Sequence, residues 1–195
     1  MEFVQPLRER VQIDAMKREF RRRNVRDWAW FVLGLNTGLR ISDILSLRVR
    51  DVINPRAARL SIARRVVLKE RKTGKARNIP LNSSARSALA EYLRETKLPE
   101  HSHLFPSREG KALGGRPISR DMAYKIIRGV AQAAGIFVQV GTHTMRKTWG
   151  YTLYQSGEDL ARIQRAMNHR DGQTTLIYIG ITQDQVDRLY LDHKI

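Results

Sequence analysis

Two short segments near the C-terminus carry side chains whose types and spacing could do chemistry. The segment NHRDGQTTLIYIG contains His169 and, nine positions later, Tyr178, and the segment THTMRKT contains His143 and Arg146 three positions apart. A tyrosine oxygen can act as a nucleophile that forms a covalent intermediate. A lone tyrosine is more often a core residue, so the residues around Tyr178 decide between the two roles.

Arg40 in NTGLRISDILSL and Lys72 in RKTGKARNIPL are further candidates for such chemistry. Two arginines, here Arg40 and Arg146, can clamp one phosphate and neutralise its oxygens in a pentavalent transition state. A lysine can protonate a leaving alkoxide, and histidines can hydrogen-bond the phosphate or move protons. With a nucleophilic tyrosine, these groups cover every role in a metal-free transesterification at a phosphodiester.

Each candidate also has a simpler interpretation. Asp43, three positions after Arg40, could orient that arginine, or it could be a first-turn carboxylate that the helix dipole favours. His169 could cap the end of the preceding helical segment. Lys69 and Lys75 flank the same predicted hairpin as Lys72.

The charge balance indicates a polyanionic partner. Of 195 residues, 36 are Lys or Arg and 19 are Asp or Glu, which gives a net charge of +17. A strongly basic chain of this kind most often binds nucleic acid, and arginine grips phosphate bidentately. The hydrophobic fraction of 42% is typical of a globular chain.

Several classes of protein are excluded or disfavoured. The chain has no cysteine, so it has neither disulfides nor Cys-based zinc sites, and its histidines do not form an H-E-x-x-H motif. We therefore expect no metal and no other cofactor. No apolar run reaches the roughly 18 residues of a membrane span, and the N-terminus lacks a signal-peptide region. The expectation is a cytoplasmic protein without a membrane partner.

Basic segments are predicted to contact double-stranded DNA, mainly through its phosphates, which give affinity rather than sequence choice. The arm KREFRRR and the stretch RRVVLKERKTGKAR carry much of this charge, and the helix expected over 119–134 is the candidate for the major groove. The predicted DNA contacts are Arg64, Arg65, Arg71, Lys75, Arg77, Arg120, Lys125 and Lys147.

The first half of the chain predicts helices followed by one hairpin. Helices are expected over 12–23, closed by Asn24, and over 25–38, ended by Gly38, followed by a short helix in LRISDILSL with Ser42 as its N-cap. The β-branched stretch 59–70 and the stretch 76–81, joined by KTGK, predict antiparallel strands.

The second half is expected to be helical. Asn82 or Ser83 would cap one helix, and Ser119 would cap the next, with Met122, Ile126 and Val130 on one face. Shorter helices are expected from His143, over 158–169 and over 173–180, with a terminal helix over 182–195. The fold class is therefore α+β, mainly α-helical with a small antiparallel sheet.

Four motifs, in order along the chain, resemble those of the catalytic domain of tyrosine recombinases, the phage integrase and Xer-type family. NTGLRISDILSL is similar to the first arginine motif, with Arg40 and Asp43, and RKTGKARNIPL to the hairpin lysine motif, with Lys72 before the Thr-Gly turn. THTMRKT resembles the His-x-x-Arg box, and MNHRDGQTTLIYI the closing box with the tyrosine. The resemblance covers nearly the whole chain, from about residue 10 onward.

The resemblance implies a fold and a reaction. The tyrosine would break one DNA strand, leaving a 3′-phosphotyrosine and a free 5′-hydroxyl, and a partner strand's hydroxyl would then attack this linkage without ATP or metal. Arg40, His143 and Arg146 would hold the phosphate, Lys72 would be the general acid, and His169 would support the phosphate or Tyr178. Relatives work as a tetramer on DNA, so we expect a monomer in solution that assembles on its site.

The domain organisation is expected to be a single catalytic domain over 1–195, with 182–195 as a helix for contacts between protomers. Most relatives have a further N-terminal DNA-binding domain of about a hundred residues, and an accessory DNA-binding protein could take its place here. Two other functions stay open: a non-catalytic DNA-binding regulator on the same fold, and a relaxing type IB topoisomerase.

Overall fold

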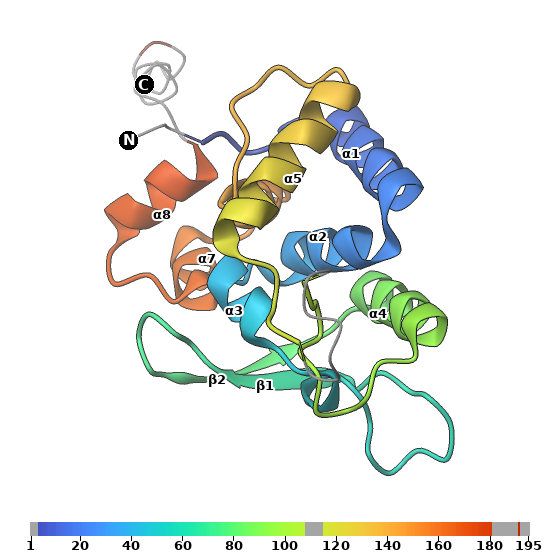
Figure 1. The fold of residues 1–195 in the computed structure, drawn as a ribbon. Coiled ribbons are helices and arrows are strands. Elements are labelled where there is room, and N and C mark those ends of the chain that lie inside the picture. Colours follow the sequence, from blue (N-terminus) through green and yellow to red (C-terminus); the bar gives the residue numbers. More distant parts are fainter. Residues whose placement is uncertain (1–3, 108–114, 181–190, 192–195) are drawn as a thin grey trace.

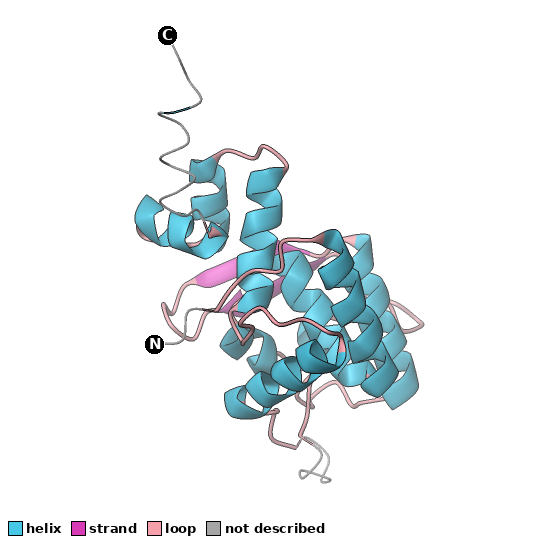
Figure 2. Ribbon diagram, turned by 90° about the horizontal axis from the view of Figure 1, so that it is seen from above, coloured by secondary structure: helices cyan, strands magenta, loops and turns pink. Residues whose placement is uncertain are grey.

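The computed structural model of the chain describes residues 4–107, 115–180 and 191. These residues form a helical body with a two-stranded antiparallel sheet beside it, as Figures 1 and 2 show, which confirms the predicted α+β class. The elements are α1 (Arg10–Arg23), α2 (Val25–Thr37), α3 (Ile41–Ser46), the 3-10 turn η1 (Val49–Asp51), β1 (Arg65–Lys69), β2 (Ala76–Pro80), α4 (Ser83–Thr96), α5 (Arg120–Ala133), α6 (Thr144–Gln155), α7 (Leu160–Met167) and α8 (Gly172–Ile179).

Helix α2 forms the centre of the main core, as its run of apolar residues predicts. Asn24 separates it from α1, and its side chain accepts hydrogen bonds from the backbone N–H groups of Arg26 and Asp27. Gly38 ends α2 with φ of 60°, and an added Cβ would lie 2.2 Å from a ring atom of Trp149. Only glycine fits this close approach, which fixes the position of the following residues.

The hairpin formed by β1 and β2 places its turn near helices from the second half of the chain. Val66 of β1 pairs with Ile79 of β2 on the buried face, whereas Val67 between Val66 and Leu68 is 63% exposed. This alternation is typical of a sheet with one solvated face. The turn between the strands lies on the same side of the molecule as α7 and α8 (Figure 1).

Two local predictions are wrong. Arg40, not Ser42, is the N-cap of α3, because the backbone is still extended at Arg40 and becomes helical at Ile41. On α5, Met122 is 46% exposed and Ile126 is only partly buried, whereas Ala123, Ile127 and Val130 are buried. The buried face of α5 is thus rotated from the predicted one.

The other helix boundaries agree with the sequence patterns to within about two residues. Asn82 caps α4 and Ser119 caps α5, each through a side-chain oxygen that accepts a backbone hydrogen bond. The predicted terminal helix over 182–195 lies outside the described residues, apart from Leu191. Within the part of the chain that the structure describes, no helix has the length and apolar character needed to cross a bilayer.

Candidate active site

A hollow of about 750 Å³ opens between α3, the hairpin turn, the start of α6 and the α7–α8 connection. Five of the six predicted catalytic residues line it, and the sixth, Arg146, is 1% exposed and buried within α6. The lining residues are Arg40, Ile41, Ser42, Arg71, Lys72, Thr73, Arg120, His143, Asn168, His169, Arg170, Asp171, Thr174 and Tyr178. Four separate sequence motifs therefore meet at one site.

Tyr178 lies in the second turn of α8, and its hydroxyl is 3.1 Å from Nδ1 of His143, the N-cap residue of α6. Burial, and then the positive charges of Arg120 and Arg146, lower the pKa of His143, so its imidazole is neutral at pH 7. A neutral Nδ1 can accept the tyrosine proton. The contact therefore pairs a tyrosine hydroxyl with a proton acceptor, an arrangement that can generate a nucleophile.

Arg146 ties the site to the core. Its guanidinium donates hydrogen bonds to the carbonyls of Gly38 and Met167, at the ends of α2 and α7, and lies 3.0 Å from Nε2 of His169. Burial lowers the pKa of Arg146 to about 10, so the group stays charged at pH 7. Its Nε is buried without a hydrogen-bond acceptor among the described residues. Such an unpaired donor could receive an anionic oxygen.

His169 is held as a neutral imidazole with one defined tautomer. Burial and the charges of Arg146 and Arg40 lower its pKa to about 4. Because arginine only donates, Nε2 must accept from Arg146, and Nδ1–H then donates to Oγ1 of Thr175 at 3.1 Å. The ring lies 4.6 Å from that of Tyr178, centroid to centroid. His169 thus supports both the arginine and the tyrosine ring.

This arrangement predicts a pH dependence of stability. The unfolded chain, with an ordinary histidine pKa of 6.5, takes up a proton as the pH falls from 6.5 to about 4, whereas folded His169 does not. The unfolded state therefore binds more protons in this window, and the free energy of unfolding falls as the pH falls. Urea unfolding of the wild type and His169→Gln between pH 4.5 and 7.5 should give a shallower slope for the variant.

The exposed His101 supplies the matched control, since His101→Gln removes a histidine that does not line the hollow. That variant should keep the wild-type slope. Equal slopes for wild type and His169→Gln would contradict the assignment of a half-buried, neutral histidine.

Arg40 is oriented by a glutamate that the sequence reasoning did not single out. Its Nη1 lies 3.0 Å from Oε2 of Glu70, and its side chain is 14% exposed. Asp43 forms no ion pair with Arg40 among the described residues. Its Oδ1 instead accepts the backbone N–H of Arg71, which anchors the hairpin turn to α3. Of the two roles expected for Asp43, the structure shows the first-turn carboxylate of α3, without a direct ion pair to Arg40 among the described residues.

The hairpin turn brings Lys72 to the hollow. Lys72 is exposed and lines the hollow, and its charge contributes to the lowered pKa of His169. Lys69 and Lys75, the alternatives on the same hairpin, do not line it. The geometry favours Lys72 as the lysine that could meet a substrate there.

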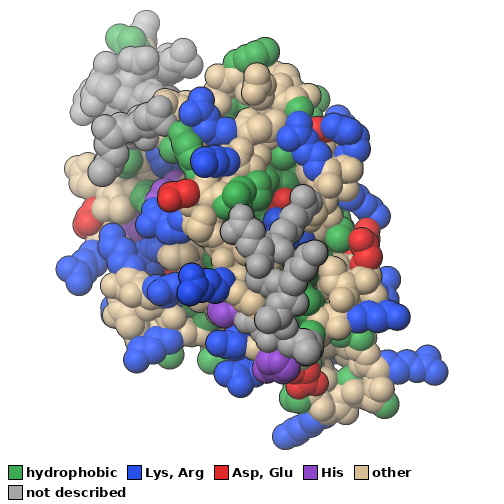
Figure 3. Space-filling model, viewed as in Figure 1, with side chains coloured by type: hydrophobic (Ala, Val, Ile, Leu, Met, Phe, Trp, Pro, Cys, Tyr) green, Lys and Arg blue, Asp and Glu red, His purple; other side chains and the backbone are tan. Residues whose placement is uncertain are grey.

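Two of the predicted DNA contacts point inward. Arg77 pairs with Glu70 and donates to the carbonyl of Ala166, and Lys147 is 6% exposed. Both predictions followed from charge alone, which does not tell which face of an element is buried. The remaining six are exposed: Arg64, Arg65, Arg71, Lys75, Arg120 and Lys125. Figure 3, which views the molecule from the same side as Figure 1, shows many Lys and Arg side chains on that face, including the part around the hairpin.

Three supporting residues were missed or passed over. Glu70 and Asn168 join the hairpin to α7 through a 2.8 Å hydrogen bond, and Thr175 holds His169. Asn168 has φ of 53°, a conformation that asparagine tolerates better than most residues, which is a signal available in the sequence. Glu70 gives no such signal, because its neighbours read as a charged surface.

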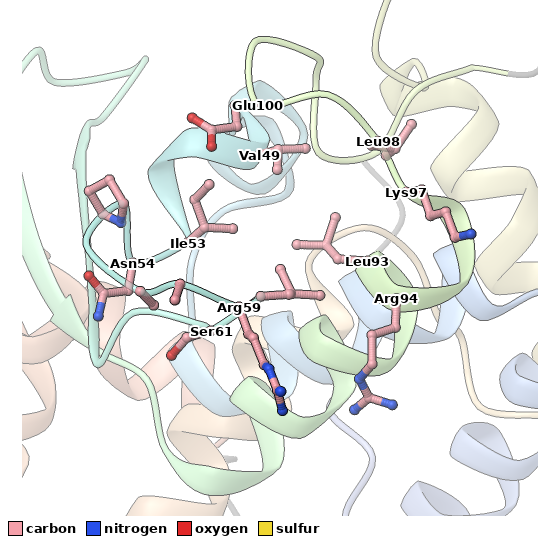
Figure 4. A pocket seen from close by; sticks show the side chains of 14 residues that line it. Val49, Ile53, Asn54, Arg59, Ser61, Leu93, Arg94, Lys97, Leu98 and Glu100 are labelled. Carbon is pink, nitrogen blue, oxygen red and sulfur yellow. The ribbon is translucent and has the colours of Figure 1, made fainter.

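A second hollow, of about 490 Å³, lies away from these residues between η1, the segment 53–61 and the end of α4. Ile53, Leu93 and Leu98 supply apolar walls, and Arg59 and Arg94 lie near them (Figure 4). It contains neither histidine nor tyrosine. Among the described residues no group of three His, Asp or Glu side chains is arranged to hold a metal ion.

The fold and this constellation define a class of DNA-processing catalytic domain, and comparison with known proteins gives the family. A model of the phage integrase family matches residues 9–185, and the chain belongs to this family. It is 39% identical over 190 residues to a probable integrase/recombinase, YoeC of Bacillus subtilis, covering 97% of each chain. It is 30% identical to the tyrosine recombinase XerD of Oceanobacillus iheyensis, over 86% of this chain and 54% of the relative.

Solved structures support the fold. The chain superposes on the XerA recombinase with a TM-score of 0.74 at 19% identity, covering all of this chain and 66% of that one. It superposes on XerH bound to its difH substrate with a TM-score of 0.70 at 20% identity, covering 97% of this chain and 55% of that one. The chain thus spans about half the length of the XerD and XerH proteins that it matches.

Proposed function

We propose that the protein is a tyrosine recombinase that breaks and rejoins DNA strands through a 3′-phosphotyrosine intermediate. The observation that carries the proposal is the contact between the Tyr178 hydroxyl and Nδ1 of His143 at the hollow that Arg40, Lys72 and His169 also line. Family membership and the names of the relatives support it.

In this reaction Tyr178 attacks the scissile phosphorus and His143 accepts its proton. Arg40, which lines the hollow, and the buried Arg146 neutralise the phosphoryl oxygens as charge builds in the transition state. Lys72 donates a proton to the leaving 5′-oxygen, which completes cleavage. In the rejoining step, the same steps run in reverse: that 5′-hydroxyl, or the 5′-hydroxyl of a partner strand, attacks the phosphotyrosine and releases Tyr178. His169 keeps Arg146 and the tyrosine ring in place.

The substrate in this proposal is double-stranded DNA. The six exposed basic residues named above would contact its phosphates, with Arg120 and Lys125 on α5 nearest the major groove. The family resemblance supports a single catalytic domain that is monomeric in solution, forms a tetramer on DNA in the cytoplasm, and could work with an accessory DNA-binding protein. The solved relatives XerH and the Tn1549 integrase are bound to DNA in their structures.

Supercoiled plasmid tests this function without knowledge of the target site. The protein is incubated with plasmid and a chelator, without added metal, and quenched in SDS, and we expect relaxed plasmid and protein covalently held at preferred sequences. Adducts spread over many sequences would indicate a topoisomerase. Tight binding without adduct or relaxation would indicate a regulator.

The same assay distinguishes the hairpin lysines. Lys72→Ala is expected to lower the adduct rate by about 10²-fold or more, because the leaving oxygen then departs without a proton. Lys69→Ala and Lys75→Ala remove the same charge from residues that do not line the hollow, so at saturating plasmid, where a lost phosphate contact no longer limits the rate, both should stay within a few-fold of wild type. A larger loss for either of these two would reassign the general acid.

A further inference from the structure

Glu70, at the hairpin turn directly after β1, is a buried carboxylate behind the lining of the hollow, and four side chains contact it. It is 1% exposed. Its Oε2 accepts hydrogen bonds from Thr73 at 2.7 Å and Asn168 at 2.8 Å and lies 3.0 Å from Nη1 of Arg40. Its Oε1 accepts from Arg77 at 3.0 Å. All four partners supply donors, so only an ionised carboxylate satisfies them together.

These contacts fasten the segments that carry the candidate catalytic groups. Arg40 is itself one of the candidates and precedes α3. Thr73 and Glu70 bracket the two turn residues that include Lys72, and Asn168 directly precedes His169. One buried side chain therefore ties the first arginine, the lysine turn and the second histidine to each other.

The charges around Glu70 explain why a carboxylate is needed there. Arg40 and Arg77 act on Arg146 as neighbouring positive charges, and Glu70 acts on it with the opposite sign. The three arginines, one buried and two largely shielded from solvent, repel each other, and an uncompensated buried charge is strongly unfavourable. Glu70 stabilises this cluster before any DNA phosphate is present.

We propose that Glu70 is the positioning residue of the site, holding Arg40, the Lys72 turn and the Asn168–His169 segment in their reactive arrangement before DNA binds. The proposal rests on the proposed function, in which these groups surround the scissile phosphate. Glu70 acts through its partners and does not itself line the hollow.

Glu70→Gln tests the proposal, because the amide nitrogen would face donors and the negative charge is lost. At saturating plasmid we expect the adduct rate to fall tenfold or more, while the DNA concentration for half-saturation stays within twofold of wild type. The matched control is Glu91→Gln, which removes the same charge from α4, where Glu91 forms an exposed ion pair with Arg21 of α1, and should leave both quantities unchanged. A wild-type adduct rate in Glu70→Gln would overturn the proposal.

A second readout does not depend on cleavage. In ¹⁵N NMR of the arginine side chains, the Arg40 guanidinium, assigned by its loss in Arg40→Lys, should rotate slowly in the wild type and freely in Glu70→Gln. An unchanged Arg40 signal would overturn the proposal even if the wild type formed no adduct, in which case the proposed function would fail separately.

Asn168→Gly covers the case in which Glu70→Gln does not fold. Glycine accepts the positive φ at this position, so the variant removes one contact to Glu70 without backbone strain. We expect a several-fold lower adduct rate at unchanged half-saturation. An unchanged rate in this variant would overturn the link to His169.

Discussion

Tyr178→Phe is expected to abolish the covalent adduct and plasmid relaxation, lowering their rates by about 10⁴-fold or more, because loss of a nucleophile leaves only binding. The variant should still fold. Phenylalanine keeps the ring beside His169 and loses only the hydroxyl contact to His143, a change of about 1 kcal/mol in the free energy of unfolding. SDS-resistant adduct and urea unfolding, measured on the same preparation, check both expectations.

Tyr151→Phe is the matched control for that variant. Tyr151 lies on α6 with its ring near the guanidinium of Arg8, and it does not line the hollow. Its adduct should form at the wild-type rate. Adduct that persisted in Tyr178→Phe and disappeared in Tyr151→Phe would move the nucleophile to α6.

Arg146→Lys is expected to have the second largest effect, and on two quantities at once. Lysine cannot reproduce the planar fork that reaches Gly38, Met167 and His169, so buried carbonyls would lose their donors. We expect the free energy of unfolding to fall by about 2–4 kcal/mol. The adduct rate should fall by about 10²- to 10³-fold, the typical cost of losing one donor to a developing oxyanion.

Arg165→Lys, on the exposed side of α7, makes the same exchange at a side chain that donates to no buried carbonyl among the described residues. It should unfold at the wild-type urea concentration and react at the wild-type rate. If Arg146→Lys also unfolded like the wild type, the structural role assigned to Arg146 would be wrong, and any lost activity would then reflect chemistry alone.

Much of the fold was predictable because local signals decide it. Asn24 and Gly38 mark helix ends by their own preferences, and the KTGK turn between β-branched stretches sets the hairpin. The candidate catalytic residues that line the hollow were also predictable, because their motifs are short and each lies within one element or its boundary. The structure brings five of the six predicted catalytic residues to its lining.

The remaining differences between the predictions and the structure arise at residues whose burial depends on contacts with distant parts of the chain. Glu70 is buried only because Asn168, 98 residues later, and Arg40 meet it. Arg77 and Lys147 read as surface charges until their neighbours are known. Met122 is exposed because the buried stripe of α5 runs through Ala123 and Ile127, a rotation that sequence periodicity alone does not resolve.

The contacts of Arg146 have a consequence for the chain while it is being made. Its guanidinium joins the carbonyl of Gly38, 108 positions earlier, to that of Met167, 21 positions later. Contacts so far apart in sequence form late, since the intervening loops must close first. Under the proposed function, a partly unfolded chain therefore has Tyr178 but not Arg146 fixed beside its ring, and it gains the ability to cut DNA only when these distant segments have closed.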